Sequence, residues 1–368
     1  RKHLPMETYP IPMVPGPVKV SEPVLQAYLT NYGSGDIERD YADLYQRTQL
    51  NLQEIYATSN EMVIMTGEGM LALWSALKST LQPGDRVLAV ASGMFGFGIA
   101  DMARSIGASV RTVDIPYNQT ITDWQAVERG IAEFRPKMIT VVHCETPSGT
   151  LNPLQRLGEL KETYAVPLLY VDAVSSAGGT PLLTDQWKID LCLGGAQKVV
   201  SAPAAMSFLS VSPRAWEIIE QVNYPGYDAL KAFHGVGESG AFPYTPYWHG
   251  TAALFAATEA IVREGLENSF KRHADVAAYC RARLARIGLT LYPAASAVQS
   301  PTLTAVNVPE GIPWAELDAR FRRQGLVVGG NYGPLANKVF RIGHMGTQAN
   351  RALVEQACDV IEKAVQQG

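Results

Sequence analysis

Short apolar runs rich in β-branched residues alternate with amphipathic helical segments between residues 61 and 212 of this chain. The runs predict strands at residues 61–65, 86–92, 109–114, 138–143, 168–172, 190–194 and 206–212. Helices are predicted between the first five strands, at residues 69–80, 96–106, 122–134 and 154–164. Strands that are joined by helices run mostly parallel, because each helix crosses back over the sheet. The sequence therefore predicts an α/β fold with a mostly parallel, doubly wound sheet of seven strands flanked by helices.

The pattern changes after about residue 246. A long helical stretch at about 248–286 is followed by strands at 302–308 and 339–343, a helix from Trp314, and a final helix at 348–366. This order is typical of a smaller α+β domain, and a chain of 368 residues exceeds the usual size of one domain. We expect a hinge within the long helical stretch.

These patterns give the expected domain boundaries. Residues 1–17 form an extended lead-in, because the prolines between residues 8 and 20 oppose a helix. A large domain is expected at residues 18–255 and a smaller C-terminal domain at residues 256–368.

Composition argues against several classes of protein. The net charge of −4 comes without a basic patch, which argues against a nucleic-acid partner. No apolar run is long enough to span a membrane. Residues 1–5 precede Met6, and we expect no signal peptide, because Pro5, Glu7 and Pro10 interrupt any apolar segment there.

The four cysteines, Cys144, Cys192, Cys280 and Cys358, lie far apart and form no CxxC pair. In a chain of this length they do not resemble a disulfide framework, so we expect buried thiols. This predicts a cytosolic, cytoplasmic protein. No metal is expected among the site residues.

Residues 168–201 place an acid and an amine at the ends of two apolar strands. Asp172 closes one strand, and Lys198 follows the other. Ligands of open α/β sheets bind outside the carboxyl ends of the strands. A carboxylate can keep a pyridine nitrogen protonated there, and a buried lysine of lowered pKa can form a Schiff base. Either residue alone would be a helix cap or a solvated lysine; together they predict a site for pyridoxal phosphate (PLP).

A glycine motif follows the first predicted strand. Gly67, Gly69 and Ala72 match the dinucleotide fingerprint GxGxxG/A, so a dehydrogenase is an alternative. That fingerprint requires an acid at the end of the next strand, and residues 86–92 end without one. The start of the helix can still bind a single phosphate through its exposed backbone N–H groups.

Three further motifs follow predicted strands. Phe95 stands in a glycine-flanked loop, where it stacks on a planar ring or covers the core. Thr146 and Ser148 offer hydroxyls to a ligand, although such residues before a glycine are often turn formers. Arg341 has the planar fork that binds a carboxylate through two hydrogen bonds, although a lone arginine is usually a surface charge.

In combination these motifs resemble the class V aminotransferases of PLP fold type I, specifically the alanine/serine–glyoxylate aminotransferase group. The cysteine desulfurases share that fold but resemble the chain less. The resemblance covers nearly the whole chain and rests on TGEG at 66–69, SGMFG at 92–96, ETPSG at 145–149, VDAVSSAGG at 171–179, GGAQK at 194–198 and PYTP at 243–246.

The resemblance implies a role for each residue around the cofactor ring. Lys198 is the catalytic lysine that binds PLP covalently, and Asp172 is the partner of the pyridine nitrogen. Phe95 stacks on one face of the ring and Val174 packs on the other. Either Thr146 or Ser148 approaches the ring hydroxyl.

The resemblance also implies the phosphate and substrate contacts. Gln197 and the amides of Gly69 and Met70 contact the phosphate, and Thr245 reaches in from a partner subunit. Arg341 binds the substrate carboxylate. A homodimer, or a higher oligomer, with sites shared between subunits is implied.

The chain departs from the group at two positions. Glu68 stands where relatives commonly carry a small residue, and a carboxylate facing a phosphate costs about 1 kcal/mol even at solvent-like dielectric. Glu68 therefore points elsewhere, for example toward the substrate amine, or the phosphate binds loosely. Ala196 stands where relatives usually carry serine.

The resemblance implies a PLP-dependent aminotransferase that moves an amino group from a small amino acid, such as alanine or serine, to glyoxylate or pyruvate. An alternative is pyridoxamine–pyruvate aminotransferase, which uses pyridoxamine as a substrate and shares the Gly-Glu turn. Gln197 argues against that alternative, as does Tyr332, which stands where that branch places an additional arginine. A desulfurase or other lyase needs a mobile cysteine, for which Cys144 is the nearest candidate. A non-catalytic homologue would have little reason to keep Asp172, Lys198 and Arg341 together.

Overall fold

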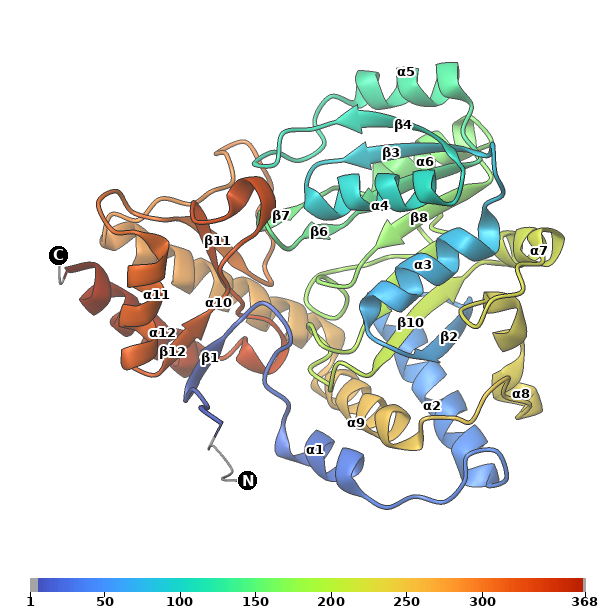
Figure 1. Cartoon of the computed structure of the whole chain (residues 1–368), viewed down its shortest axis with the longest axis horizontal. Helices are drawn as coiled ribbons and strands as arrows, with labels where there is room; N and C mark the ends of the chain where they lie inside the picture. The colour runs from blue at the N-terminus through green and yellow to red at the C-terminus, as the bar shows by residue number, and fades with distance from the viewer. Residues whose placement is uncertain (1–5, 367–368) are drawn as a thin grey trace.

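The computed structural model describes residues 6–366 and contains the predicted seven-stranded sheet (Figure 1). Its strands lie in the order β2 (Glu61–Thr66), β10 (Met206–Val211), β9 (Leu191–Gly195), β8 (Leu168–Asp172), β5 (Met138–Val142), β3 (Arg86–Ala91) and β4 (Ser109–Asp114). Neighbouring strands are parallel except at β10, which is antiparallel to both β2 and β9. The predicted fold class is confirmed.

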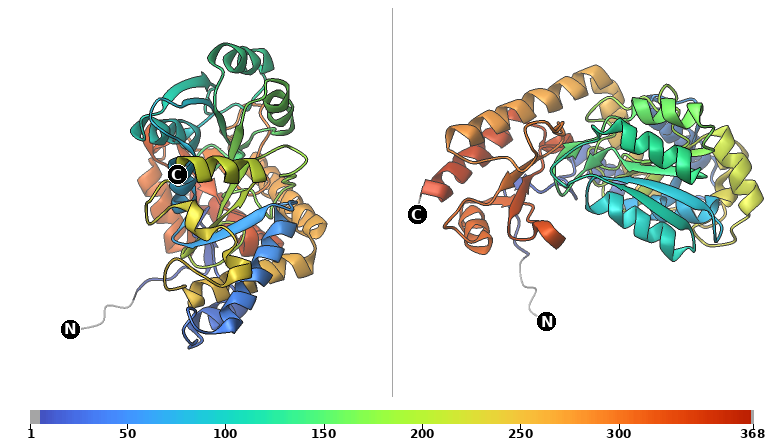
Figure 2. Two further views of the ribbon diagram at one scale, coloured as in Figure 1. Left: turned by 90° about the vertical axis from the view of Figure 1, so that its right-hand side faces the viewer. Right: turned by 90° about the horizontal axis from the view of Figure 1, so that it is seen from above.

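Helices cover both faces of this sheet. They are α3 (Gly69–Thr80), α4 (Met94–Ser105), α5 (Trp124–Phe134), α6 (Gln155–Thr163) and α7 (Pro213–Val222). Helices α3 and α4 lie on one face, and α5 and α6 lie on the other (Figure 2). Strands β5, β8, β9 and β10 are buried along their full length, which explains their uninterrupted apolar runs.

Two helices precede the sheet and were absent from the sequence prediction. They are α1 (Glu22–Leu29) and α2 (Arg39–Ile55), and both pack against α9 (Trp248–Glu264). Neither has a side-chain cap at its N-terminus. Smaller elements follow them, namely the hairpin of β6 (Cys144–Glu145) and β7 (Thr150–Leu151), η1 (Leu230–Phe233) and α8 (Val236–Ser239).

The predicted long helix at 248–286 is two helices. Helix α9 ends at Gly265, whose φ of 85° and ψ of 133° break the helical path, and α10 (Leu266–Arg286) begins directly after it. Glycine reaches such a φ without the steric penalty that a Cβ would impose. The chain direction therefore changes at one residue within the stretch.

The remaining elements include those that build a second hydrophobic core together with α10 (Figure 1). They are β11 (Thr304–Asn307), α11 (Trp314–Arg323), β12 (Leu326–Val328), η2 (Gly333–Leu335), β13 (Val339–Ile342), η3 (Gly346–Gln348) and α12 (Arg351–Gln366). The lead-in joins this core, because β1 (Ile11–Met13) pairs in parallel with β12. The division of the chain at residue 255 stays a prediction.

No helix between residues 6 and 366 has the length and apolarity that crossing a membrane requires.

Candidate active site

The carboxyl ends of β8 and β9 carry Asp172 and lead to Lys198, as predicted. The Asp172 carboxylate is buried, and one of its oxygens accepts a hydrogen bond from the Val174 amide at 2.9 Å. Burial raises the pKa of Asp172 to about 6, against the opposing effects of the Val174 amide and the Lys198 charge. Asp172 is therefore an anion at neutral pH with little solvent around it.

The Lys198 amine donates a hydrogen bond to the carbonyl of Pro15 at 2.6 Å. Its side chain runs over Gly16, whose φ is 89° and where a Cβ would overlap the lysine methylenes. Burial, followed by the Arg341 charge, lowers the pKa of Lys198 to about 8, although Asp172 and Glu68 oppose that shift. A substantial fraction of the amine is therefore neutral near physiological pH, as a nucleophile requires.

Arg341 lies on β13 and is 8% exposed. Its Nε donates to the carbonyl of Gly330 at 2.8 Å, and its guanidinium carbon lies 5.3 Å from the centroid of the Tyr332 ring. Within residues 6–366 the guanidinium makes no ion pair with a carboxylate. A buried arginine without an anionic partner is suited to bind a substrate carboxylate.

Glu68 caps the N-terminus of α3. One carboxylate oxygen accepts from the Met70 amide at 3.1 Å, and the other accepts from the side-chain amide of Gln197 at 3.0 Å. An anion in this place is stabilised by the helix dipole. These donors are among the groups predicted to bind the phosphate. A carboxylate from the chain itself therefore occupies the predicted phosphate contacts.

Gly69, Val174 and Gly195 bring α3 and β9 close together. A Cβ at Gly69 would lie 3.4 Å from Val174 Cγ1 and 3.6 Å from the Cα of Gly195. The structure thus brings Gly69, Met70, Val174 and Gln197 to one end of the site.

Phe95 is the second residue of α4 and is half-buried. Its amide donates to the carboxylate of Glu145 at 3.2 Å, and the Gly96 amide donates to the other oxygen of Glu145 at 2.7 Å. Glu145 is fully buried, and burial raises its pKa to about 7 despite the two amides. Sequence reasoning missed Glu145 as a partner of the Phe95 turn. Gly93 makes room for this carboxylate, because a Cβ there would lie 2.5 Å from Glu145 Cδ.

The hydroxyls of Thr146 and Ser148 are both buried and already paired. Thr146 Oγ1 lies 2.5 Å from Ser175 Oγ, and Ser148 Oγ lies 3.0 Å from Thr150 Oγ1. A hydroxyl can donate one hydrogen bond and accept another, so each keeps capacity for a ligand.

Cys144 and Thr245 complete the set of predicted residues. Cys144 is buried with its Sγ 3.2 Å from Ser300 Oγ, and burial raises its pKa to about 11. It is therefore neither mobile nor a thiolate, in contrast to what a desulfurase needs. Thr245 is exposed, lines a small cavity with Thr66, and is not brought to Lys198 within this chain.

The two ends of the site fit a pyridoxal group differently. At the ring end, Asp172 and Lys198 supply the anion and the amine that such a ring needs. At the other end, the side-chain oxygen of Gln197 is buried without a partner, while its amide is committed to Glu68. The ring fits the residues present, whereas a phosphate would have to share its amides with a carboxylate.

Comparisons with known proteins agree with this geometry. Residues 17–335 match the family described as aminotransferase class-V. The chain is 34% identical to an alanine–glyoxylate aminotransferase of Callithrix jacchus, over 90% of this chain and 82% of that protein. It is 31% identical to a pyridoxamine–pyruvate transaminase of Mesorhizobium japonicum, over 92% of this chain and 87% of that protein.

A solved structure of an alanine–glyoxylate aminotransferase from Nostoc sp. superposes with a TM-score of 0.94 at 29% identity, covering 99% of this chain and 97% of that one. The match extends over both hydrophobic cores and both ends of the site. The chain therefore belongs to the class V aminotransferase family and is an aminotransferase.

Proposed function

We propose that this enzyme moves an amino group from a small amino acid, such as alanine or serine, to glyoxylate or pyruvate. The observation that carries the proposal is the buried Arg341 guanidinium, which has no carboxylate partner and lies close enough to lower the pKa of Lys198. Amino acids and 2-oxo acids share an α-carboxylate, which Arg341 would hold. The ring of Tyr332 lies against the same guanidinium.

Each of the other residues has a role in this proposal. A bound pyridoxal group supplies the electron sink that weakens the bonds of the substrate's α-carbon. Asp172 keeps the proton on the ring nitrogen, because its buried carboxylate favours a neighbouring positive charge. Lys198 attaches the cofactor covalently and then moves a proton at the α-carbon. Its lowered pKa favours the neutral amine that both steps need.

The remaining contacts follow the same arrangement. Phe95 and Val174 would enclose the ring, and Thr146 or Ser148 would bind its hydroxyl. Thr245 would reach the site of a second copy in a homodimer, which its exposure on this chain supports. The four free, buried cysteines support a cytosolic location.

Glu68 favours a second candidate, in which pyridoxamine and pyruvate are the substrates. Its carboxylate accepts the hydrogen bonds that a phosphate would otherwise receive. Two anions about 4 Å apart repel by about 1 kcal/mol in water and more near a protein surface. A pyridoxal group without its phosphate avoids that repulsion, and one relative is a pyridoxamine–pyruvate transaminase.

A visible spectrum of the purified protein, followed by a screen of donors and acceptors, tests both candidates. A yellow protein that alanine, serine or glycine bleaches supports the first. A colourless protein that converts pyridoxamine and pyruvate to pyridoxal and alanine supports the second. Lys198→Ala should abolish steady turnover in either case; a variant that turned over normally would contradict the role of Lys198.

A further inference from the structure

His273 is a buried histidine that the proposed function does not use. It lies near the start of α10, shortly after the break at Gly265, and is fully buried. Burial lowers its pKa to about 4, so the ring is neutral at physiological pH. Nδ1 lies 2.7 Å from the carbonyl of Ser269, to which it donates. Nε2 is therefore left to accept a hydrogen bond from the Gly346 amide at 2.9 Å.

Arg272, the residue before it, contacts the same turn. Its Nε and Nη2 donate to the carboxylate of Glu264 at 2.6 and 2.8 Å. Its Nη1 donates to the carbonyls of Gly346 and Ala349 at 2.8 and 2.9 Å. Arg272 and His273 thus hold η3 from one side and anchor it to the last turn of α9.

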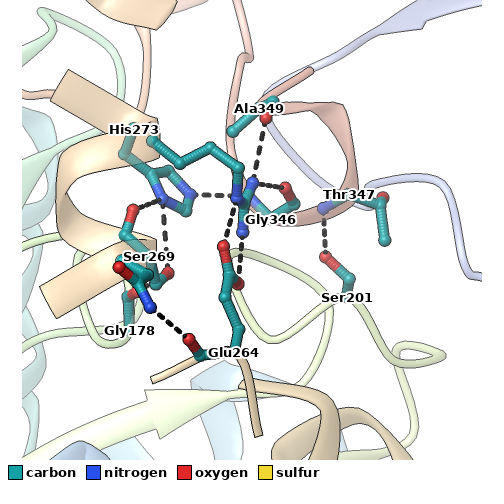
Figure 3. A network of polar contacts seen from close by, with 10 residues as sticks. Gly178, Ser201, Glu264, Ser269, His273, Gly346, Thr347 and Ala349 are labelled. Atoms are coloured by element: carbon teal, nitrogen blue, oxygen red, sulfur yellow. Dashed lines mark hydrogen bonds and ion pairs between the residues drawn. The ribbon is translucent and has the colours of Figure 1, made fainter. Parts of the chain in front are cut away.

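The η3 turn lies directly against the backbone that follows Lys198. Figure 3 shows His273, Gly346, Thr347 and Ser201 in sequence across this contact. The Thr347 amide donates to Ser201 Oγ at 3.0 Å, and the Ser201 amide donates to the Lys198 carbonyl at 2.9 Å. A Cβ at Gly346 would overlap Ser201 Oγ and the Val199 carbonyl, so the contact depends on this glycine.

The same turn also fixes the acceptor of the Lys198 amine. The side-chain amide of Gln348 donates to the Val14 carbonyl at 2.9 Å, and its oxygen accepts from the Lys19 amide at 2.8 Å. Between these two residues lies Pro15, whose carbonyl accepts from Lys198 Nζ at 2.6 Å. The η3 turn therefore acts on the lysine indirectly at both ends, through Ser201 on the backbone side and through Val14 and Lys19, which flank Pro15, on the amine side.

We propose that Arg272 and His273 are positioning residues for Lys198, which act through the η3 turn to fix its backbone and its Pro15 contact. This inference rests on the proposed function only in taking Lys198 as the point of attachment. Neither side chain is placed near a substrate. They affect the position of the Lys198 amine, because their hydrogen bonds fix the η3 turn, and the η3 turn in turn binds Ser201 and Val14.

Arg272→Gln tests the proposal against a matched control. Arg283 lies on the same helix and also forms ion pairs, in its case with Asp359 and Glu362, but it makes no hydrogen bond to η3. Arg283→Gln therefore removes an equivalent arginine from the same helix. The probes are PLP and pyridoxal, titrated by absorbance across pH. Arg272→Gln should weaken attachment about tenfold, the loss expected for a charge-assisted hydrogen bond, and shift its pH midpoint, while Arg283→Gln should do neither.

Hydrogen exchange of the unliganded protein gives a readout that needs no cofactor. Arg272→Gln should speed exchange in residues 198–202 and 346–349 at least tenfold, with Arg283→Gln matching the wild type there. If both variants raised exchange equally, the arginine would stabilise the fold in general and the proposal would be wrong. If the wild type bound neither PLP nor pyridoxal, the proposed function would be wrong. The hydrogen-exchange comparison of the two variants would still test the positioning role of Arg272.

His273 provides a second pair of variants should Arg272→Gln not fold. His273→Gln can keep an acceptor for the Gly346 amide, whereas His273→Leu cannot. We expect His273→Gln to bind the probes and to exchange slowly at residues 198–202, as the wild type does. We expect His273→Leu to do neither. Equal behaviour of the two variants would overturn a role for that hydrogen bond.

Discussion

Gln197 donates a hydrogen bond to the Glu68 carboxylate across the N-terminus of α3, at 3.0 Å. The chain thus brings its own anion to the place where a class V aminotransferase is expected to bind a phosphate. We expect this pair to set the preference of the enzyme between a phosphorylated ring and one that lacks the phosphate.

Glu68→Ser is expected to raise the ratio of the affinity for PLP to the affinity for pyridoxal by tenfold or more. The substitution removes a negative charge and frees the Met70 amide and the Gln197 side chain for a phosphate. Titration of both compounds by absorbance measures the ratio. Glu68→Gln separates charge from size, because it keeps the volume. An unchanged ratio in both variants would show that Glu68 does not compete with phosphate.

Covalent attachment of PLP to the unliganded enzyme should speed up as pH rises and level off above about pH 8. The neutral amine is the nucleophile, and the pKa of Lys198 is lowered to about 8. Arg341→Gln should move the midpoint to higher pH, because the Arg341 charge lowers that pKa. Asp172→Asn should move it to lower pH, because the Asp172 charge raises it. Stopped-flow absorbance across pH provides the midpoints, and shifts of the opposite sign would contradict the assigned neighbours.

Glu145→Gln should alter how stability depends on pH. The folded pKa of Glu145, about 7, lies above its ordinary value of 4.5, so folding favours the protonated acid. Its contribution is fully present below pH 4.5 and is lost as pH rises through 7. Between pH 5 and 8 the free energy of unfolding of the neutral variant should therefore rise relative to that of the wild type, by on the order of 3 kcal/mol. Urea unfolding at several pH values measures the difference, and a constant offset would refute the raised pKa.

Gly16→Ala should abolish attachment of the cofactor to Lys198. The added Cβ would overlap the lysine side chain, in a backbone conformation with a φ of 89°. Gly84→Ala is the matched control, because Gly84 has a φ of 86° but no atom within 4 Å of the added Cβ. Both variants should lose about 1 kcal/mol of stability from backbone strain. Equal retention of the cofactor by both would show that the Gly16 contact is unimportant.

Cys144→Ala should leave transamination within about twofold of the wild-type rate. The thiol is buried, pairs with Ser300 and has a raised pKa, so it takes no part in proton or sulfur transfer. The wild type should release no sulfide from cysteine. Sulfide release that the substitution abolished would revive the lyase alternative.

The sheet could be predicted because four of its strands, β5, β8, β9 and β10, are fully buried and mostly apolar, and helical segments separate the first five predicted strands. All seven lie within two residues of their predicted positions. An apolar run carries no information about strand direction, so the antiparallel placement of β10 required the structure. The sequence prediction missed α1 and α2; α1 is only eight residues long, and neither helix has a side-chain cap that marks its N-terminus.

Within the site, strand ends located Asp172 and Lys198, because topology alone brings such positions to one edge. The contacts between distant segments could not be predicted in this way. Glu145 meets the Phe95 amide across 50 residues of sequence, and Lys198 meets Pro15 across 183. The sequence showed that Glu68 departs from the small residue common in relatives. The direction in which its carboxylate points depends on local geometry, which the sequence does not give.

The β1 strand pairs with β12 while Pro15, two residues beyond it, accepts the Lys198 amine. One short peptide thus couples the edge of the C-terminal core to the reactive nitrogen. Proteolytic removal of the residues before Pro17 would leave every strand of the large sheet intact and yet change the basicity of the lysine. Residues 11–16 therefore contribute to the surroundings of the reactive amine although they belong to no strand of the large sheet.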